Sequence, residues 1–286
     1  MNESPLFSIL VANHNDGRII NDALASVAKQ TYSNIEIIIV DDGSTDDSMN
    51  ILHELEKAEN VHVFYNDVNH GCGFTKRKCV EKANGEICGF LDADDALTPD
   101  AVETMVNEHL SHPTTALVYS RYYMCDSQLT PKYVSDHQCE IPEGRTFLDY
   151  KRGAISHFVT FKKRFYDMTE GMNPNLHAAE DLDLYYKLEE VGNTLFIDKP
   201  LYYYRGNTGK NTTLGGNTVR AAHWEIIAKT DAIRRRGINL DKNGIPLIEE
   251  ITDSILDYKK KHSREYKMGN CILHPKELIQ TIKRHL

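Results

Sequence analysis

The sequence predicts an α/β protein in which helices flank a mostly parallel central sheet, with a helical extension at the C-terminus. Two observations predict this. Over the first 123 residues, short apolar runs alternate with segments of helical periodicity, which is typical of βαβ units with right-handed crossovers. Beyond residue 216 the pattern is helical. We therefore expect two domains in the chain, at residues 1–215 and 216–286.

Five strands are expected in the alternating part. The second, IEIIIV at residues 35–40, is apolar on both faces, as a strand buried in a parallel sheet should be. The five strands cover residues 7–12, 35–40, 61–65, 87–91 and 116–123.

Four helices are expected between these strands. Ser44 begins an S-x-x-D capping pattern and is expected to open the second helix, and Pro99 fits the first turn of the fourth. The helices cover residues 21–30, 44–59, 74–83 and 99–112.

The pattern changes after residue 123. Residues 124–156 contain prolines and glycines without a clear period, which predicts an irregular or hairpin insertion. A Gly/Asn/Thr-rich loop covers residues 206–217. Further strands are expected at 157–161, 194–197 and 201–204, and further helices at 179–191, 217–236 and 247–261.

Composition argues against several classes of protein. No apolar run approaches the roughly 18–20 residues that a membrane span needs. The 33 basic residues against 42 acidic ones give a net charge of −9, which argues against a nucleic-acid binder. The first residues lack the pattern of a secretory signal, and the six cysteines form no C-x-x-C pair. We therefore expect a cytoplasmic protein with reduced thiols.

Acidic residues follow two of the expected parallel strands. Asp41 and Asp42 follow the second strand, and Asp92-Ala93-Asp94-Asp95 follows the fourth. Ligands of open parallel sheets bind outside the carboxyl ends of the strands. Three carboxylates in four residues repel one another, and Mg²⁺ or Mn²⁺ offsets such repulsion while also binding phosphate oxygens. The sequence therefore predicts metal-assisted phosphate binding, although a turn with a helix cap explains Asp41 and Asp42 equally well.

The third loop, with Gly71-Cys72-Gly73, does not complete a nucleotide motif. Lys76 stands where G-x-G-x-x-G needs its last glycine, and the chain contains no G-x-x-x-x-G-K-[ST]. A Rossmann dinucleotide site and a P-loop are therefore excluded. Lys76 and Arg77 lie either near a bound diphosphate or on a solvated helix face.

A second acidic pair, Glu180-Asp181, begins the helix expected from residue 179. Asp181 lines up with Leu184, Tyr185 and Leu188 at helical spacing, which predicts that it faces inward, with Glu180 at the edge of that face. Acidic residues that complement the helix dipole are the alternative interpretation.

Taken in order, these motifs resemble those of the family-two glycosyltransferases, which have the GT-A fold. The resemblance covers roughly residues 6–205 and excludes the helical tail. The matching segments are residues 8–15, 26–32, 36–46, 69–86, 92–99, 179–184 and 203–205.

The resemblance implies transfer of a hexose from a nucleoside-diphosphate sugar, expected to be UDP-linked, to an acceptor hydroxyl with inversion at the anomeric carbon. Asp181 would be the general base, with Glu180 beside it. Asp94, with Asp92, would hold Mn²⁺ or Mg²⁺. The residues that would bind the nucleotide are Ala12, His14, Asp42, Asn69, Lys76 and Asp92.

Two alternative functions stay open at this point. A nucleotidyltransferase also combines an α/β sheet with acidic loops, but it usually has a Gly/Arg/Lys-rich loop near its N-terminus, which residues 7–16 lack. The other alternative is a sugar-nucleotide-binding protein without catalysis.

The resemblance suggests a glycan or lipid-linked glycan acceptor in polysaccharide biosynthesis. In the tail, Leu278, Ile279 and Ile282 share a helical face near basic residues. Such a segment could place the protein peripherally at the inner face of the membrane. Packing of the tail on the first domain is the alternative.

Overall fold

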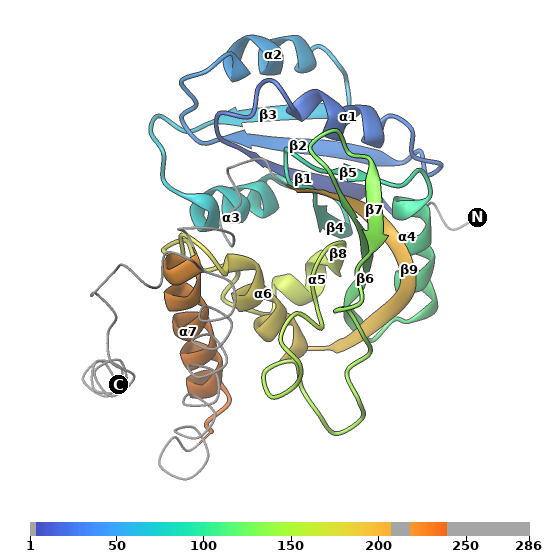
Figure 1. Cartoon of the computed structure of the whole chain (residues 1–286), viewed down its shortest axis with the longest axis vertical. Coiled ribbons are helices and arrows are strands. Elements are labelled where there is room, and N and C mark those ends of the chain that lie inside the picture. Colours follow the sequence, from blue (N-terminus) through green and yellow to red (C-terminus); the bar gives the residue numbers. More distant parts are fainter. Residues whose placement is uncertain (1–3, 207–217, 239–286) are drawn as a thin grey trace. The chain divides into compact units, whose positions relative to one another are not determined.

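The computed structural model of the chain describes residues 4–206 and 218–238 (Figure 1). The chain divides into two compact units, residues 1–210 and 211–286, and each is described by itself. The described strands all belong to the first unit. They form one sheet in the order β3-β2-β1-β4-β8-β6-β9-β5, and β7 pairs with β6 outside this path.

The first four strands of this order are parallel. Strand β1 (Phe7–Asn13) pairs with β2 (Ile35–Asp41) on one side and with β4 (Ile87–Phe90) on the other. Strand β3 (Val61–Tyr65) pairs with β2. Every residue of β2 is buried, as its β-branched sequence predicts. This part of the sheet confirms the predicted βαβ arrangement.

Helices cover both faces of these strands. In Figure 1, α1 (Ile20–Val27) and α2 (Ser48–Leu55) lie above β1–β3, and α3 (Cys72–Lys82) lies below them. The predicted start of the second helix at Ser44 is wrong. The Ser44 hydroxyl donates to Asp41 Oδ1 at 2.6 Å, which closes a turn after β2, and α2 begins only at Ser48.

The rest of the sheet is mixed. Strand β8 (Val159–Lys162) runs antiparallel between β4 and β6 (Thr115–Cys125), and β9 (Asn193–Arg205) is parallel to β6. The short β5 (Ala96–Leu97) is antiparallel to β9. A parallel return requires a crossover, usually a helix, and residues 126–158 contain none, so the chain returns from β6 to β8 in the opposite direction. The α/β fold class is confirmed, and its parallel part is β3-β2-β1-β4 together with β6-β9.

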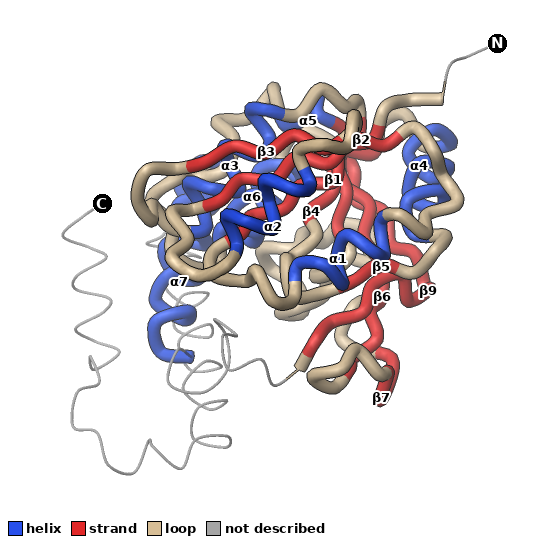
Figure 2. The backbone as a smooth tube through the Cα atoms, turned by 90° about the horizontal axis from the view of Figure 1, so that it is seen from above, coloured by secondary structure: helices blue, strands red, loops and turns tan. Residues whose placement is uncertain are grey.

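Four further elements complete the first unit. Strand β7 (Pro131–Val134) forms a hairpin with β6 within the segment expected to be irregular, and Figure 2 shows it projecting beyond the rest of the sheet. Helix α4 (Ala101–Ser111) precedes β6, and the short α5 (Lys163–Tyr166) follows β8. Helix α6 (Glu180–Glu189) follows at the position where a helix was expected.

Two strands expected at 194–197 and 201–204 form one continuous strand, β9. Its register with β6 shifts beside Arg121, opposite Pro200. A bulge absorbs the residues between the two apolar runs, so the strand bends without ending. Figure 1 shows β9 as a long curved ribbon along the edge of the fold.

The amino ends of the central strands are fastened by a buried carboxylate. Glu36 in β2 accepts hydrogen bonds from the Ser8 hydroxyl and from the main-chain N–H groups of Asn84 and Gly85. A Cβ atom at Gly85 would lie 2.4 Å from the Ser8 hydroxyl oxygen, so this close approach requires glycine. The opposite, carboxyl ends of the strands carry the acidic loops.

The described part of the second unit is helix α7 (Thr218–Arg235) with the residues that follow it to 238. It agrees with the helix expected at 217–236. The helix expected at 247–261 and the apolar face of Leu278, Ile279 and Ile282 lie outside the described residues. Within residues 4–206 and 218–238, no helix combines the length and apolarity needed to cross a bilayer.

Candidate active site

Asp42, directly after β2, shapes the loop that follows β3. Its carboxylate accepts hydrogen bonds from Asn66 Nδ2 at 2.8 Å and from the main-chain N–H groups of His70 and Gly71 at 2.9 and 2.8 Å. Both oxygens are therefore engaged within the chain, and the side chain is buried. Asp42 thus lies at the carboxyl edge of the sheet as expected, and its contact with a nucleotide stays a prediction.

Two more of the predicted nucleotide residues lie beside Asp42. His14 Nδ1 is 2.9 Å from the carbonyl oxygen of Asp42, and His14 Nε2 is 3.0 Å from Asn69 Nδ2. Ala12 is the residue of β1 that lies opposite Val40 of β2, two positions before His14. The structure therefore gathers His14, Asp42 and Asn69 from three loops at one edge of the sheet, with Ala12 near the end of β1.

Lys76 connects the two acidic sites that the sequence separates by more than eighty residues. Its ammonium lies 3.3 Å from Asp92 Oδ1 and 3.2 Å from Glu180 Oε1. The Phe90 ring lies 5.5 Å from the same nitrogen. The Lys76 side chain is 9% exposed, so the alternative of a solvated helix face is wrong for this residue.

Burial and charge set the protonation of this cluster. Burial opposes the charged form of Lys76, yet its pKa lies well above the ordinary value, because Asp92 and the other acidic neighbours outweigh desolvation. Burial likewise opposes the charge of Asp92, but the nearby Lys76 ammonium keeps the pKa of Asp92 below its ordinary value. The pair is therefore ionised at neutral pH.

The same oxygen of Glu180 that contacts Lys76 also accepts a hydrogen bond from a thiol. Cys72 Sγ donates to Glu180 Oε1 at 3.2 Å. Burial and the Glu180 charge raise the pKa of the Cys72 thiol well above its ordinary value, so this cysteine stays protonated. The first two turns of α3 thus supply both of these partners of Glu180.

Asp181 lies near Lys76 and Asp92, which agrees with its predicted inward face, but Glu180 is more buried than its predicted place at the edge of that face. Glu180 is the buried member, at 6% exposure, whereas Asp181 is partly exposed. The prediction used only the spacing of the apolar residues of α6. It could not include the ion pair between Glu180 and Lys76 of α3. Asp181 is therefore the more accessible carboxylate at the start of α6.

Asp181 has an environment suited to accepting a proton. Burial, together with repulsion from Glu180, raises the pKa of Asp181 to about 6. Its Oδ1 accepts a hydrogen bond from the main-chain N–H of Leu182 at 2.8 Å. The N-terminus of a helix favours a charged carboxylate, and here desolvation outweighs that effect. The carboxylate is still mostly ionised at pH 7.

The acids of the loop after β4 have separate roles. Asp95 is buried and accepts hydrogen bonds from the Tyr202 hydroxyl at 2.8 Å and from the main-chain N–H of Arg205 at 2.7 Å. Asp94 is less buried, and burial with repulsion from Asp92 and Asp16 raises its pKa to about 6. Asp95 therefore fastens the loop to β9, whereas Asp94 is the more exposed carboxylate and lies among acidic neighbours.

Asp94 fits a hard divalent cation only in company with a ligand. In the part of the chain that the structure describes, no group of three or more His, Cys, Asp or Glu side chains could hold a metal ion. Carboxylate oxygen is nevertheless the donor that Mg²⁺ and Mn²⁺ prefer, and such ions often bind one or two carboxylates plus phosphate oxygens. The donor set therefore fits a metal that arrives with a diphosphate.

His157 lies at this edge without having been predicted. Its ring stacks on Tyr202 and Tyr204, with centroids 5.0 and 5.3 Å apart. Burial outweighs the attraction of Asp92 and lowers its pKa, so the ring is neutral at pH 7. The histidine follows an insertion without periodicity, so only the long-range pairing of β8 and β9 with β6 could reveal its place.

Comparisons with known proteins decide the family. The profile described as Glycosyl transferase family 2 matches residues 8–169, more than half of the chain. The chain belongs to glycosyl transferase family 2. The family-two resemblance of the motifs is thereby confirmed.

Family members of known name are similar to this chain. The chondroitin synthase of Escherichia coli is 32% identical over 242 residues, which cover 82% of this chain and 33% of that protein. The hyaluronan synthase of Pasteurella multocida is 27% identical over 305 residues, covering 99% and 30%. The chain thus spans about a third of the length of these relatives.

Solved structures share the fold of this glycosyl transferase family 2 chain. A crystal structure of a fragment of S. aureus TarS in complex with UDP-GlcNAc matches with a TM-score of 0.71 and 19% identity, over 96% of this chain and 79% of that one. The likeness confirms the predicted GT-A type of fold.

Proposed function

We propose that this chain is an inverting glycosyltransferase that moves a sugar from a UDP-linked donor to an acceptor hydroxyl. The observation that carries the proposal is the position of Lys76, 3.3 Å from Asp92 on the acidic loop and 3.2 Å from Glu180 beside Asp181. One ammonium links the loop suited to a diphosphate with the helix that carries the proposed base. Donor and acceptor would therefore meet at a single site.

Asp94, with Asp92 beside it, would hold Mn²⁺ or Mg²⁺ together with the donor phosphates. When bound, the cation would neutralise the negative charge that develops on the departing diphosphate. The raised pKa of Asp94, caused by burial and by repulsion from its acidic neighbours, supports this role, because a cation relieves that repulsion.

Asp181 would accept the proton of the incoming hydroxyl. A base with a pKa near 6 is mostly ionised at pH 7 and still accepts a proton, and such a base typically contributes about 10²–10⁴-fold to a rate. A single displacement needs only this one base, and it inverts the anomeric carbon. Glu180 would act beside it by holding α6 against Lys76.

Similar proteins support the proposed donor and acceptor. Two TarS structures contain UDP and UDP-GlcNAc, which supports a uridine nucleotide. The names of the chondroitin and hyaluronan synthases support a glycan acceptor and a place in polysaccharide biosynthesis. A cytoplasmic location, peripheral at the inner face of the membrane, stays part of this proposal.

A screen of UDP-sugars with Mn²⁺ or Mg²⁺ and short glycan acceptors tests the function. We expect UDP release that depends on the acceptor, and NMR should find the opposite anomeric configuration in the product. Retention of configuration would contradict the single displacement. Pyrophosphate release from a nucleoside triphosphate would favour a nucleotidyltransferase, and donor binding without any turnover would favour an inactive binding protein.

A further inference from the structure

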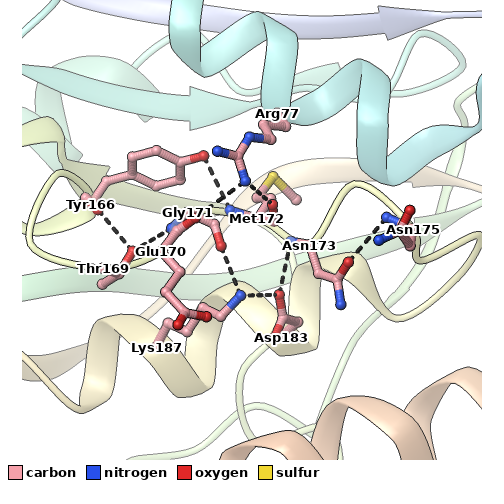
Figure 3. Close-up of polar contacts among 10 residues, drawn as sticks. All are labelled: Arg77, Tyr166, Thr169, Glu170, Gly171, Met172, Asn173, Asn175, Asp183 and Lys187. Atoms are coloured by element: carbon pink, nitrogen blue, oxygen red, sulfur yellow. Dashed lines mark hydrogen bonds and ion pairs between the residues drawn. The ribbon is translucent and has the colours of Figure 1, made fainter.

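The segment that leads into α6 is fastened from both sides by buried or half-buried cations. On one side, Arg77 of α3 donates through Nη1 to the carbonyl oxygens of Glu170 and Met172, at 3.2 and 3.0 Å. Figure 3 shows the guanidinium reaching this segment from above. Both hydrogen bonds go to main-chain oxygens, so they hold the backbone of residues 170–172 and do not use the side chains there.

On the other side, α6 holds the segment by its own ion pair. Lys187 Nζ donates to Asp183 Oδ2 and to the carbonyl oxygen of Gly171, both at 2.7 Å. The same Asp183 oxygen accepts from the main-chain N–H of Asn173 at 3.0 Å. Figure 3 shows both side chains projecting from α6 toward residues 171–173, opposite Arg77. Four successive residues, 170–173, thus bond through their main chain to α3 or α6.

The first turn of α3 packs directly against the same segment. The main-chain N–H of Gly73 donates to the carbonyl oxygen of Leu176 at 3.2 Å. A Cβ atom at Gly73 would lie 2.5 Å from that oxygen and 2.7 Å from the carbonyl oxygen of Asn173. The contact therefore leaves no space for a side chain at residue 73.

The buried ion pair of Lys187 and Asp183 has a desolvation cost that its hydrogen bonds must offset. Lys187 and Asp183 are 5% and 1% exposed, and burying such charges requires desolvation that an apolar pair of similar volume avoids. An apolar pair, however, could not bond Gly171 and Asn173. The pair thus determines where the chain runs before α6 begins, seven residues ahead of Glu180.

We propose that Lys187 and Asp183, with Arg77 opposite them, are positioning residues that hold the start of α6, and with it Asp181, in register with α3. The inference rests on the proposed function, since Asp181 is the proposed base. The Glu180 contact with Lys76 attaches α6 to α3 through a side chain, and the segment 170–176 attaches it through the main chain. A displacement of about 1 Å at a reacting group can cost on the order of 10²-fold in rate, so both attachments matter for turnover.

The test compares the double variant Asp183→Asn/Lys187→Met with the wild type. Removing both charges together avoids leaving one of them buried and unpaired. We expect kcat to fall by about 10²-fold while the KM for the UDP-sugar changes little, because the predicted nucleotide residues lie outside α6 and the segment before it. The single variant Lys187→Arg should keep most of the wild-type turnover, since a guanidinium can donate to both Asp183 and Gly171.

A matched control is the double variant Lys163→Met/Asp167→Asn. This pair has the same i, i+4 spacing, from the first residue of α5 to the residue just after it, with its charged atoms 3.5 Å apart and more exposed. We expect wild-type kcat and KM in the control. Unchanged kcat in the α6 variant, or an equal loss in the control, would overturn the inference.

Amide hydrogen exchange gives a readout that needs no turnover. In the folded α6 variant, residues 170–176 and the first turn of α6 should exchange faster than in the wild type, while β1–β4 keep their protection. Unchanged protection of both segments would overturn the inference. An inactive wild type with faster exchange in the variant would instead overturn the proposed function and leave the positioning role supported.

Discussion

Lys76 and Glu180 form an ion pair across 3.2 Å between two helices that the sequence separates by about a hundred residues. Because Asp92 lies on the other side of the same ammonium, the pair joins the acidic edge of the sheet to the start of α6.

Asp181→Asn should reduce transfer by about 10²–10⁴-fold, because an amide cannot take the proton of the attacking hydroxyl. Binding of the UDP-sugar, measured by calorimetry, should stay near the wild-type value. Asp136→Asn, at an exposed position, is the control and should leave both quantities unchanged. Retained turnover in Asp181→Asn would refute the assignment of the base.

The rate should fall on the acid side with a midpoint near pH 6. Burial and the charge of Glu180 raise the pKa of Asp181 to about 6, so protonation removes the base as the pH drops below that value. Between pH 7 and 8 the rate should be nearly constant. A profile of kcat against pH with its midpoint near 4, the ordinary range of a carboxylate, would contradict this environment for Asp181.

Chelation of divalent metal should abolish transfer and weaken the binding of UDP. Asp94→Asn should have the same effect in the presence of Mn²⁺, because the amide replaces the carboxylate ligand. Titration of UDP with and without EDTA measures both effects. Equal affinity of the wild type for UDP in the two conditions would count against the metal site.

Lys76→Met should destabilise the fold by about 3–5 kcal/mol, because it leaves the buried Glu180 without its cation. Adding Glu180→Gln should recover part of this loss, since the second substitution removes the unpaired charge. Urea unfolding of both variants measures the difference. If Lys76→Met alone had wild-type stability, the ion pair would contribute little to holding α6.

Asp42→Ala should weaken UDP binding because it releases the loop after β3, whose N–H groups at His70 and Gly71 it holds. Faster hydrogen exchange of residues 66–71 should accompany the loss. Affinity equal to the wild type would remove Asp42 and its loop from the nucleotide site.

Local periodicity was sufficient for the first half of the fold. The alternation of buried runs and helices located β1–β4 and α1–α4, and parallel topology alone brought the acids after β2 and β4 to one edge. Where the prediction failed in this half, a local turn formed in place of the expected start of a helix. Ser44 bonds Asp41 in a turn, which an S-x-x-D pattern cannot distinguish from a helix cap.

Long-range contacts limited what the sequence could predict in the second half. The hairpin strand β7 and the two-residue β5 have no periodicity of their own and exist through pairing with β6 and β9. The burial of Glu180 depends on Lys76, and the place of His157 depends on rings of β9. The roles of the site residues toward ligands stay predictions, because they concern atoms outside this chain.

The bonds from Tyr202 and from the main chain of Arg205 to Asp95 have a consequence for protein engineering. The acidic loop cannot be replaced by itself with the loop of a related enzyme. Its last aspartate, Asp95, accepts hydrogen bonds from β9, more than a hundred positions downstream. Chimaeras in this region should therefore exchange the loop and the end of β9 together.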